Sequence, residues 1–184
     1  MGRTLSLAFS LSAFVLVAGC SGKDPYSPGT KLGVFHVTAK LVTTTCGPTP
    51  DPWEFDVRLN HEAQTVYWVQ GGAPIQGIVD ATTARTELTT VTTHDVRPAD
   101  ARARRPACAI VRSDVLAVTL ADAEARPAGD PSRVVTFSGA LVYGWTPTEG
   151  SDCSDQVTAT GGDFASLPCE VRYEVTGAFK SAAP

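Results

Sequence analysis

Three histidines, an acidic run and an arginine-rich run are the side chains of this sequence best suited to chemistry. His36, His61 and His94 could exchange protons near neutral pH, and residues 151–155 (SDCSD) could offer oxygens to calcium. Residues 97–105 carry four arginines that could bind an anionic surface. No GxSxG, HExxH, P-loop or EF-hand motif accompanies them, and the acidic run lacks the dense carboxylates of a calcium loop. We therefore interpret these side chains as solvated surface residues and expect neither enzymatic activity nor a metal or cofactor.

The most specific motif lies at the end of the N-terminal apolar run. Arg3 precedes the apolar or small residues 5–17, a run too short to cross roughly 30 Å of hydrocarbon as a helix but typical of a secretory signal peptide. Residues 17–20, with the sequence VAGC, follow directly. This string resembles the lipobox of bacterial lipoproteins, with valine in place of the commoner leucine.

The resemblance implies a lipid-anchored protein of the cell envelope. By that resemblance, residues 1–19 form a helical signal peptide that is removed, and Cys20 receives diacylglycerol and usually an N-acyl chain such as palmitate. Ser21 stands where an aspartate often signals retention in the inner membrane, so the resemblance implies sorting to the outer membrane. Residues 20–32 are rich in Ser, Gly, Pro and Lys, and we expect them to form a flexible tether.

Four cysteines remain beyond Cys20: Cys46, Cys108, Cys153 and Cys169. An even number in an exported domain predicts two disulfides. Zinc sites need closely paired ligands such as CxxC, and these four are widely separated, so we expect no metal here. Two pairings remain open. We favour Cys153–Cys169 with Cys46–Cys108, and the alternative is Cys46–Cys169 with Cys108–Cys153.

Charge and length limit the class of protein. The chain has 184 residues and a net charge of −4 at pH 7, with acidic and basic residues mixed. Nucleic-acid binding requires a basic excess, so we expect no nucleic-acid partner. The length beyond the tether fits a single domain, which we assign to residues 33–181, followed by a short tail at 182–184.

Alternation of apolar and polar residues predicts β-strands along most of the domain. It is clearest in residues 35–41 (FHVTAKL), 53–60 (WEFDVRLN) and 170–180 (EVRYEVTGAFK). Such a pattern indicates strands with one buried and one solvated face, as in antiparallel sheets. Weaker patterns predict further strands at 65–70, 75–80, 85–94, 107–120 and 134–146. We expect a bulge at Arg112–Asp114 and a bend at Gly139.

About eight strands with short or medium connections predict an all-β fold. The simplest arrangement is an antiparallel up-and-down meander that forms a closed or nearly closed barrel, because eight strands can close around their own side chains. In strand count this layout resembles the calycin-like barrels of lipocalin and avidin type. A two-sheet β-sandwich is the alternative.

A meander also predicts what each end of the domain carries. Counting strands from the tether places all four cysteines at the opposite end, together with loops 95–106 and 146–166. Rigid scaffolds commonly carry function on such loops. We therefore expect a partner to contact these loops first, at the end that points away from the membrane. Their opposite charges would hold this rim together or meet a partner of mixed charge.

Three functional hypotheses follow. The first is a non-enzymatic binding or structural role in the envelope, with an envelope protein as partner. The second is a carrier of a small apolar ligand inside the barrel. The third is an enzyme whose site is assembled in three dimensions from His94 and the carboxylates of Asp152 and Asp155. Six inward aromatic residues either line a ligand cavity or simply fill the core: Trp53, Phe55, Trp68, Tyr143, Trp145 and Tyr173.

Overall fold

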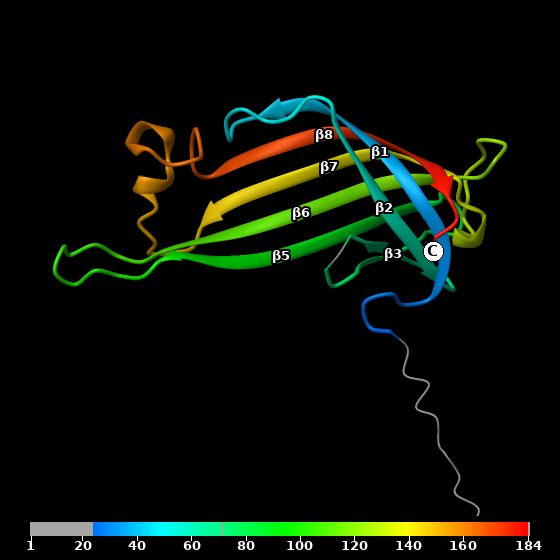
Figure 1. Ribbon diagram of the computed structural model, residues 1–184, viewed down its shortest axis with the longest axis horizontal. Coiled ribbons are helices and arrows are strands. Elements are labelled where there is room, and N and C mark those ends of the chain that lie inside the picture. Colours follow the sequence, from blue (N-terminus) through cyan, green and yellow to red (C-terminus); the bar gives the residue numbers. More distant parts are fainter. Residues whose placement is uncertain (1–23, 71, 184) are drawn as a thin grey trace, which may run out of the picture.

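The computed structural model describes residues 24–70 and 72–183, which form an all-β domain (Figure 1). Eight antiparallel strands follow one another as a meander: β1 (Thr30–Thr44), β2 (Trp53–Glu62), β3 (Thr65–Val69), β4 (Ile75–Ile78), β5 (Arg85–Arg97), β6 (Cys108–Ala121), β7 (Thr136–Pro147) and β8 (Cys169–Ser181). Three short 3₁₀ turns lie in the connections: η1 (Pro131–Arg133), η2 (Ser154–Gln156) and η3 (Thr158–Thr160). The predicted all-β meander is confirmed.

The sheet curls into a nearly closed barrel. β1 pairs with both β2 and β8, so the strand order is β4-β3-β2-β1-β8-β7-β6-β5. The β-sandwich alternative is therefore wrong. One seam remains, between β4 and β5, where Gly77 allows the two strands to approach: a Cβ there would lie 2.6 Å from the carbonyl oxygen of Glu87. Because β4 has four residues and β5 has thirteen, β4 covers only the first part of β5.

The two ends of the barrel carry different connections (Figure 1). What we call the tether end holds residues 24–29, the C-terminal residues, and the turns at 63–64, 79–84 and 122–135. The opposite end, here called the disulfide end, holds the connections at 45–52, 70–74, 98–107 and 148–168. All four cysteines beyond Cys20 lie at the disulfide end, as the strand count predicted.

The folded domain begins before the expected boundary at residue 33. β1 starts at Thr30, and the side-chain amide of Asn60 donates hydrogen bonds to Ser27 Oγ and to the Pro28 carbonyl, at 3.1 and 2.9 Å. The expected signal peptide at 1–19 and the expected lipidated Cys20 lie outside the described residues. Within the described part of the chain, no helix has both the length and the apolar character needed to cross a membrane.

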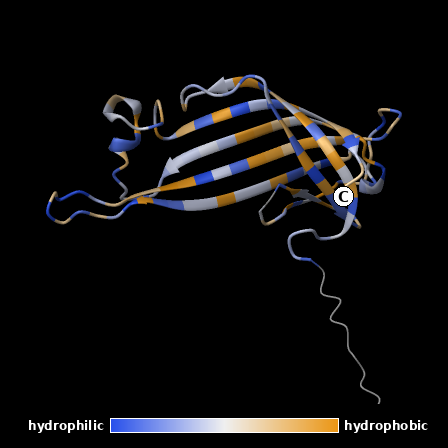
Figure 2. Cartoon of the chain, viewed as in Figure 1, coloured by the Kyte–Doolittle hydropathy of each residue, from blue (hydrophilic) through white to orange (hydrophobic). Residues whose placement is uncertain are grey.

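Apolar side chains fill the half of the barrel next to the tether end. Phe35 is fully buried, with its ring centroid 6.0 Å from that of Phe137 and 5.9 Å from that of Phe179. The cavity left between Leu59, Leu120 and their neighbours measures about 10 Å³, no more than one water needs. Alternating hydrophobic and hydrophilic bands along β6, β7 and β8 show the pattern that builds this core (Figure 2).

A compact loop closes the tether end. The side chain of Asp122 accepts hydrogen bonds from the backbone N–H groups of Glu124 and Arg126, both at 3.0 Å, and from the guanidinium of Arg133 at 2.9 Å. Burial works to raise the pKa of Asp122, but its hydrogen bonds with Arg126 hold that pKa below its ordinary value. The charged carboxylate therefore organises the whole turn.

Two local features of β6 and β7 were expected from the sequence, a bulge at Arg112–Asp114 and a bend at Gly139. The bulge at Arg112–Asp114 is wrong, because β6 pairs with β5 and β7 in unbroken register through these residues. Gly139 does lie where a side chain is excluded, since a Cβ there would collide with the carbonyl of Ala117. The unbroken register of β6 shows that Arg112 and Asp114 occupy inward positions without disturbing the strand.

The favoured disulfide pairing is also wrong. The structure joins Cys46 to Cys169 and Cys108 to Cys153, with Cα–Cα distances of 5.0 and 4.9 Å. The reason is closure of the barrel. Cys46 follows β1 and Cys169 begins β8, which are hydrogen-bonded neighbours, while Cys108 begins β6 beside the end of β7. Each disulfide thus reinforces the end of one strand pair.

Candidate functional site: the mouth of the barrel

Toward the disulfide end, charged side chains enter the interior of the barrel beside apolar ones. Arg112 and Asp114 occupy inward positions of β6, between Ile110 and Leu116, both of which are buried. The Nε of Arg112 donates to Asp114 Oδ1 at 2.8 Å, and the two side chains are 40% and 22% exposed. A partly desolvated ion pair adds little to stability on average, so its inward placement points to a role other than packing.

The ion pair lies in a cavity of about 180 Å³ that opens at the disulfide end. We call this cavity the mouth. Its wall is formed by three groups of residues: the aromatic Trp53, Trp68 and Tyr143, the aliphatic Ile75, Leu88, Leu116 and Leu141, and the polar Gln70, Arg112 and Asp114. An apolar pocket with a few convergent polar groups is the usual form of a binding site.

Aromatic rings support the mouth from behind. Phe55 lies between Trp53 and Trp68, with ring centroids 4.5 and 6.0 Å away. Trp53 also contacts Tyr173, whose hydroxyl donates to the Pro50 carbonyl at 3.2 Å. Such edge and tilted contacts fix the ring orientations. The Trp53 and Trp68 rings therefore form a preorganised wall.

Arg112 links the mouth to the aromatic residues of β7. Its guanidinium carbon lies 5.1 Å from the ring centroid of Tyr143 and 5.7 Å from that of Trp145, within cation–π range. Burial first, and then the negative charge of Asp114, raise the pKa of Tyr143 to about 12, against the opposing charge of Arg112. Tyr143 is therefore a neutral phenol at physiological pH and remains available for hydrogen bonding.

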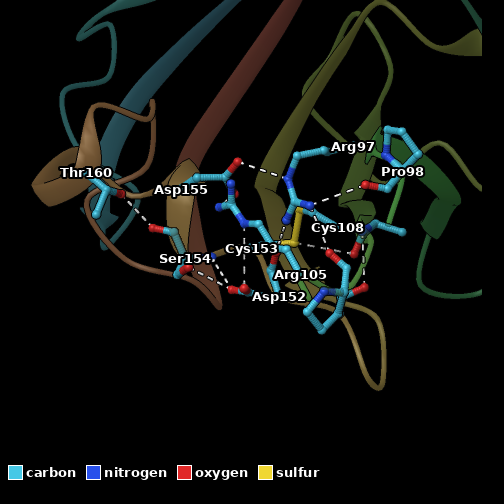
Figure 3. Close-up of polar contacts among 12 residues, drawn as sticks. Arg97, Pro98, Arg105, Cys108, Asp152, Cys153, Ser154, Asp155 and Thr160 are labelled. Atoms are coloured by element: carbon cyan, nitrogen blue, oxygen red, sulfur yellow. Dashed lines mark hydrogen bonds and ion pairs between the residues drawn. A yellow bond between two sulfur atoms is a disulfide. The ribbon is translucent and has the colours of Figure 1, made fainter. Parts of the chain in front are cut away.

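Ion pairs hold together the two long loops that rise beside the mouth (Figure 3). Arg97 lies 3.2 Å from Asp155 through its Nε and donates to the backbone carbonyl of Asp152 at 2.7 Å. Arg105 lies 3.0 Å from the other carboxylate oxygen of Asp155. The Cys108–Cys153 disulfide joins the same two segments. Arg97 and Arg105 therefore bind the acidic loop of this chain, which is the first of the two roles expected from the opposite charges, and the interpretation of these two arginines as solvated residues is wrong.

Half of the six aromatic residues named from the sequence line the mouth: Trp53, Trp68 and Tyr143. The others lie behind it. Phe55 and Tyr173 pack against Trp53, and Trp145 packs against Phe164 with ring centroids 5.9 Å apart.

Sequence reasoning missed three polar residues of the mouth: Gln70, Arg112 and Asp114. The sequence did contain a pattern that places Arg112 and Asp114 inside the barrel. They fall on the same alternate positions as Ile110 and Leu116, so strict alternation through residues 107–120 would have placed them inside.

His36 and His94 each have a polar partner, while the Nδ1 of His61 is buried and has no hydrogen-bond partner among the described residues. His36 Nδ1 lies 2.9 Å from Asp56 on the outer surface, and His94 Nε2 lies 3.2 Å from Thr92 Oγ1. The Asp155 carboxylate, proposed to accompany His94, is paired with Arg97 and Arg105 instead. The Asp152 carboxylate accepts a hydrogen bond from Ser154 Oγ at 2.7 Å and lies 3.7 Å from Arg105. Within residues 24–70 and 72–183, no group of three or more His, Cys, Asp or Glu side chains is positioned to hold a metal ion.

Comparison of the chain with known protein families, with curated proteins and with solved structures gave no significant match.

Proposed function

We propose that this protein is a non-enzymatic binding protein of the cell envelope, anchored by lipid at Cys20 in the outer membrane, and that it captures its ligand in the mouth. The observation that carries the proposal is the Arg112–Asp114 pair at inward positions of an aromatic-walled cavity. Stability alone favours apolar side chains at such positions. A ligand that meets both the rings and the charges accounts for their presence.

The arrangement of the ends supports this role. Residues 24–29 enter at the tether end (Figure 1), and Trp53 and Gln70, which line the mouth, lie at the other end. An anchor at Cys20 would hold the tether end near the bilayer and present the mouth away from it. Two disulfides suit an exported, oxidising setting.

The carrier hypothesis has less support. A mouth of about 180 Å³ is smaller than the roughly 300 Å³ at which pockets for drug-sized molecules begin, and the deeper barrel is filled. The mouth therefore suits a small group, or one end of a larger ligand, better than a lipid enclosed along its length.

The binding site can be tested by photo-crosslinking in cells. A photoreactive benzoylphenylalanine replaces Gln70, which lines the mouth, or Gln76, an exposed residue on the outward face of β4. We expect a discrete adduct from position 70, none from position 76, and loss of the adduct in the double variant Arg112→Leu/Asp114→Leu. An adduct from position 76 with none from position 70 would place the site elsewhere.

The anchor is tested separately. Metabolic labelling with a palmitate analogue should modify the wild-type chain and leave the Cys20→Ala variant unlabelled. Equal labelling of that variant contradicts the lipid anchor, whatever the crosslinks show.

A further inference from the structure

The disulfide-end portion of β5 has a free hydrogen-bonding edge. β5 is the last strand in the sheet order and pairs only with β6. The inward residues of β5 become more exposed along the strand, beyond the part that β4 covers. Thr86 and Leu88 are buried, Thr90 is partly buried, and Thr92 and His94 are exposed. Among the described residues, the hydrogen bond that reaches this edge from the β4 side comes from the Asp80 N–H to the Arg85 carbonyl, at the start of the strand. An open β-edge offers a row of backbone donors and acceptors.

This edge carries little of the usual protection against pairing: the register shift between Asp95 and Arg97 and the charges of these two residues lie at its last residues. Proteins commonly guard an edge strand with lysine, proline or inward charges. β5 contains neither lysine nor proline, and its inward positions beyond Leu88 hold two threonines and a histidine. Apolar β-branched side chains are exposed beside the seam: Val91 on β5 is 64% exposed and Ile78 on β4 is 75% exposed. Such side chains favour strand formation.

The mouth lies along the same seam. Ile75 of β4 and Leu88 of β5 both line it, from opposite sides of the gap. A strand added to β5 beyond β4 would direct alternate side chains into the barrel, as β4 does with Ile75 and Gly77. The cavity of about 180 Å³ has room for one aromatic ring, since an apolar cavity of about 150 Å³ binds benzene.

We propose that the ligand of the mouth is an extended polypeptide segment. Its backbone pairs with the free edge of β5, and one of its aromatic side chains enters the mouth beside Trp68 and Leu88. The uncharged threonines at inward positions of β5, and the Arg112–Asp114 pair with its balanced opposite charges, match an uncharged, β-branched segment with a single aromatic anchor. This inference rests on the proposed function and names its ligand class.

A selection experiment supplies the probe. Random dodecapeptides displayed on phage are selected on the purified full chain in detergent, and the strongest binder is synthesised. We expect it to carry an aromatic residue flanked by β-branched residues at alternate positions. Changing that aromatic residue to alanine should weaken the Kd by about tenfold or more.

Two variants locate the contact. Gln70→Trp places a large ring at the mouth and should abolish binding of the peptide. Gln76→Trp makes the same exchange on the outward face of β4 and should leave the Kd unchanged.

Amide hydrogen exchange then identifies strand addition. With peptide bound, alternate amides in residues 89–96 should exchange more slowly, and N-methylation of alternate peptide amides should weaken the Kd by about tenfold. A peptide that binds the mouth without slowing these amides overturns strand addition and leaves the proposed function intact. Strand addition is likewise overturned, and the proposed function left intact, if selection yields no peptide while the mouth binds a small aromatic molecule.

A second copy of this chain is the rival occupant of the edge. Protected amides at residues 89–96 in the protein without peptide, together with a dimeric mass in solution, would assign the edge to self-association and overturn the proposal. If neither peptides nor small aromatic molecules bind the mouth, the proposed function fails together with it.

Discussion

The two halves of the barrel have different interiors, one closely filled and one hollowed. Toward the tether end, β1 and β7 contribute Phe35 and Phe137 to a core with a residual cavity of about 10 Å³. Toward the disulfide end, β6 and β7 contribute Arg112, Asp114 and Tyr143 to an open cavity of about 180 Å³. The half next to the tether end therefore supplies stability, and the half next to the disulfide end holds a site that stability does not require.

The largest effect should come from the filled half. Phe35→Ala removes a fully buried ring and should lower the free energy of unfolding by ~3–5 kcal/mol. Urea unfolding followed by circular dichroism, with the disulfides intact, measures this value. Val91→Ala, at an exposed position of β5, is the control and should change stability by less than ~0.5 kcal/mol. A loss below ~1 kcal/mol for Phe35→Ala would mean that the tether half is not the stabilising core.

The disulfides should show the next largest effect. Removing either bridge by paired Cys→Ala exchange should cost ~2–4 kcal/mol. The Cys46–Cys169 bridge spans 123 residues and the Cys108–Cys153 bridge spans 45, so the chain-entropy argument makes the first more stabilising by about 1 kcal/mol. Thermal unfolding of the two double variants ranks them. The reverse order would show that anchoring the loop with Asp152 and Asp155 outweighs chain entropy.

Substitutions in the mouth should leave stability nearly unchanged and abolish binding, unlike the substitutions in the filled half. Arg112→Leu/Asp114→Leu replaces a partly buried ion pair with apolar side chains, and we expect a stability within about 1 kcal/mol of wild type, or higher. Binding in the mouth should be lost. The unfolding free energy and the crosslinked adduct from position 70 are measured on the same variant. A strong loss of stability would assign the pair to the structural core and remove the contrast between the halves.

The smallest effect concerns Tyr143. Its pKa of about 12 reflects burial first and the charge of Asp114 second, so Asp114→Asn should shift it toward the ordinary value of 10.0. Because the folded-state pKa is raised, the neutral phenol stabilises the fold fully below pH 10 and loses this contribution as the pH rises toward 12. Ultraviolet titration of tyrosine ionisation, with Tyr143→Phe to assign the signal, measures the shift. An unchanged pKa in the Asp114→Asn variant would show that Asp114 does not act on the ring.

The sequence predicted the fold well because the inward residues near the tether end obey strict alternation. Phe35, Val37 and Ala39 are all fully buried, as the period of two requires. The disulfide pairing could not be chosen from spacing, since it depends on β1 and β8 becoming neighbours, and that contact forms only when the sheet curls.

The mouth was harder to predict for a different reason. Its aromatic residues follow the alternation and could be named, but Arg112 and Asp114 violate the rule that inward positions are apolar. We therefore read them as a bulge, although β6 is regular there. The free edge of β5 was also invisible in the sequence, because it results from the difference in length between β4 and β5 rather than from any residue type.

Methyl NMR with p-cresol, the side-chain analogue of tyrosine, tests the contrast between the halves most directly. The account predicts that p-cresol shifts the methyl signals of Ile75, Leu88 and Leu141 around the mouth. The signals of Leu59, Leu120 and Val175 in the filled half should stay where they are. Shifts confined to this second set, or spread evenly over both sets, would contradict the claim that one half of the barrel packs and the other binds.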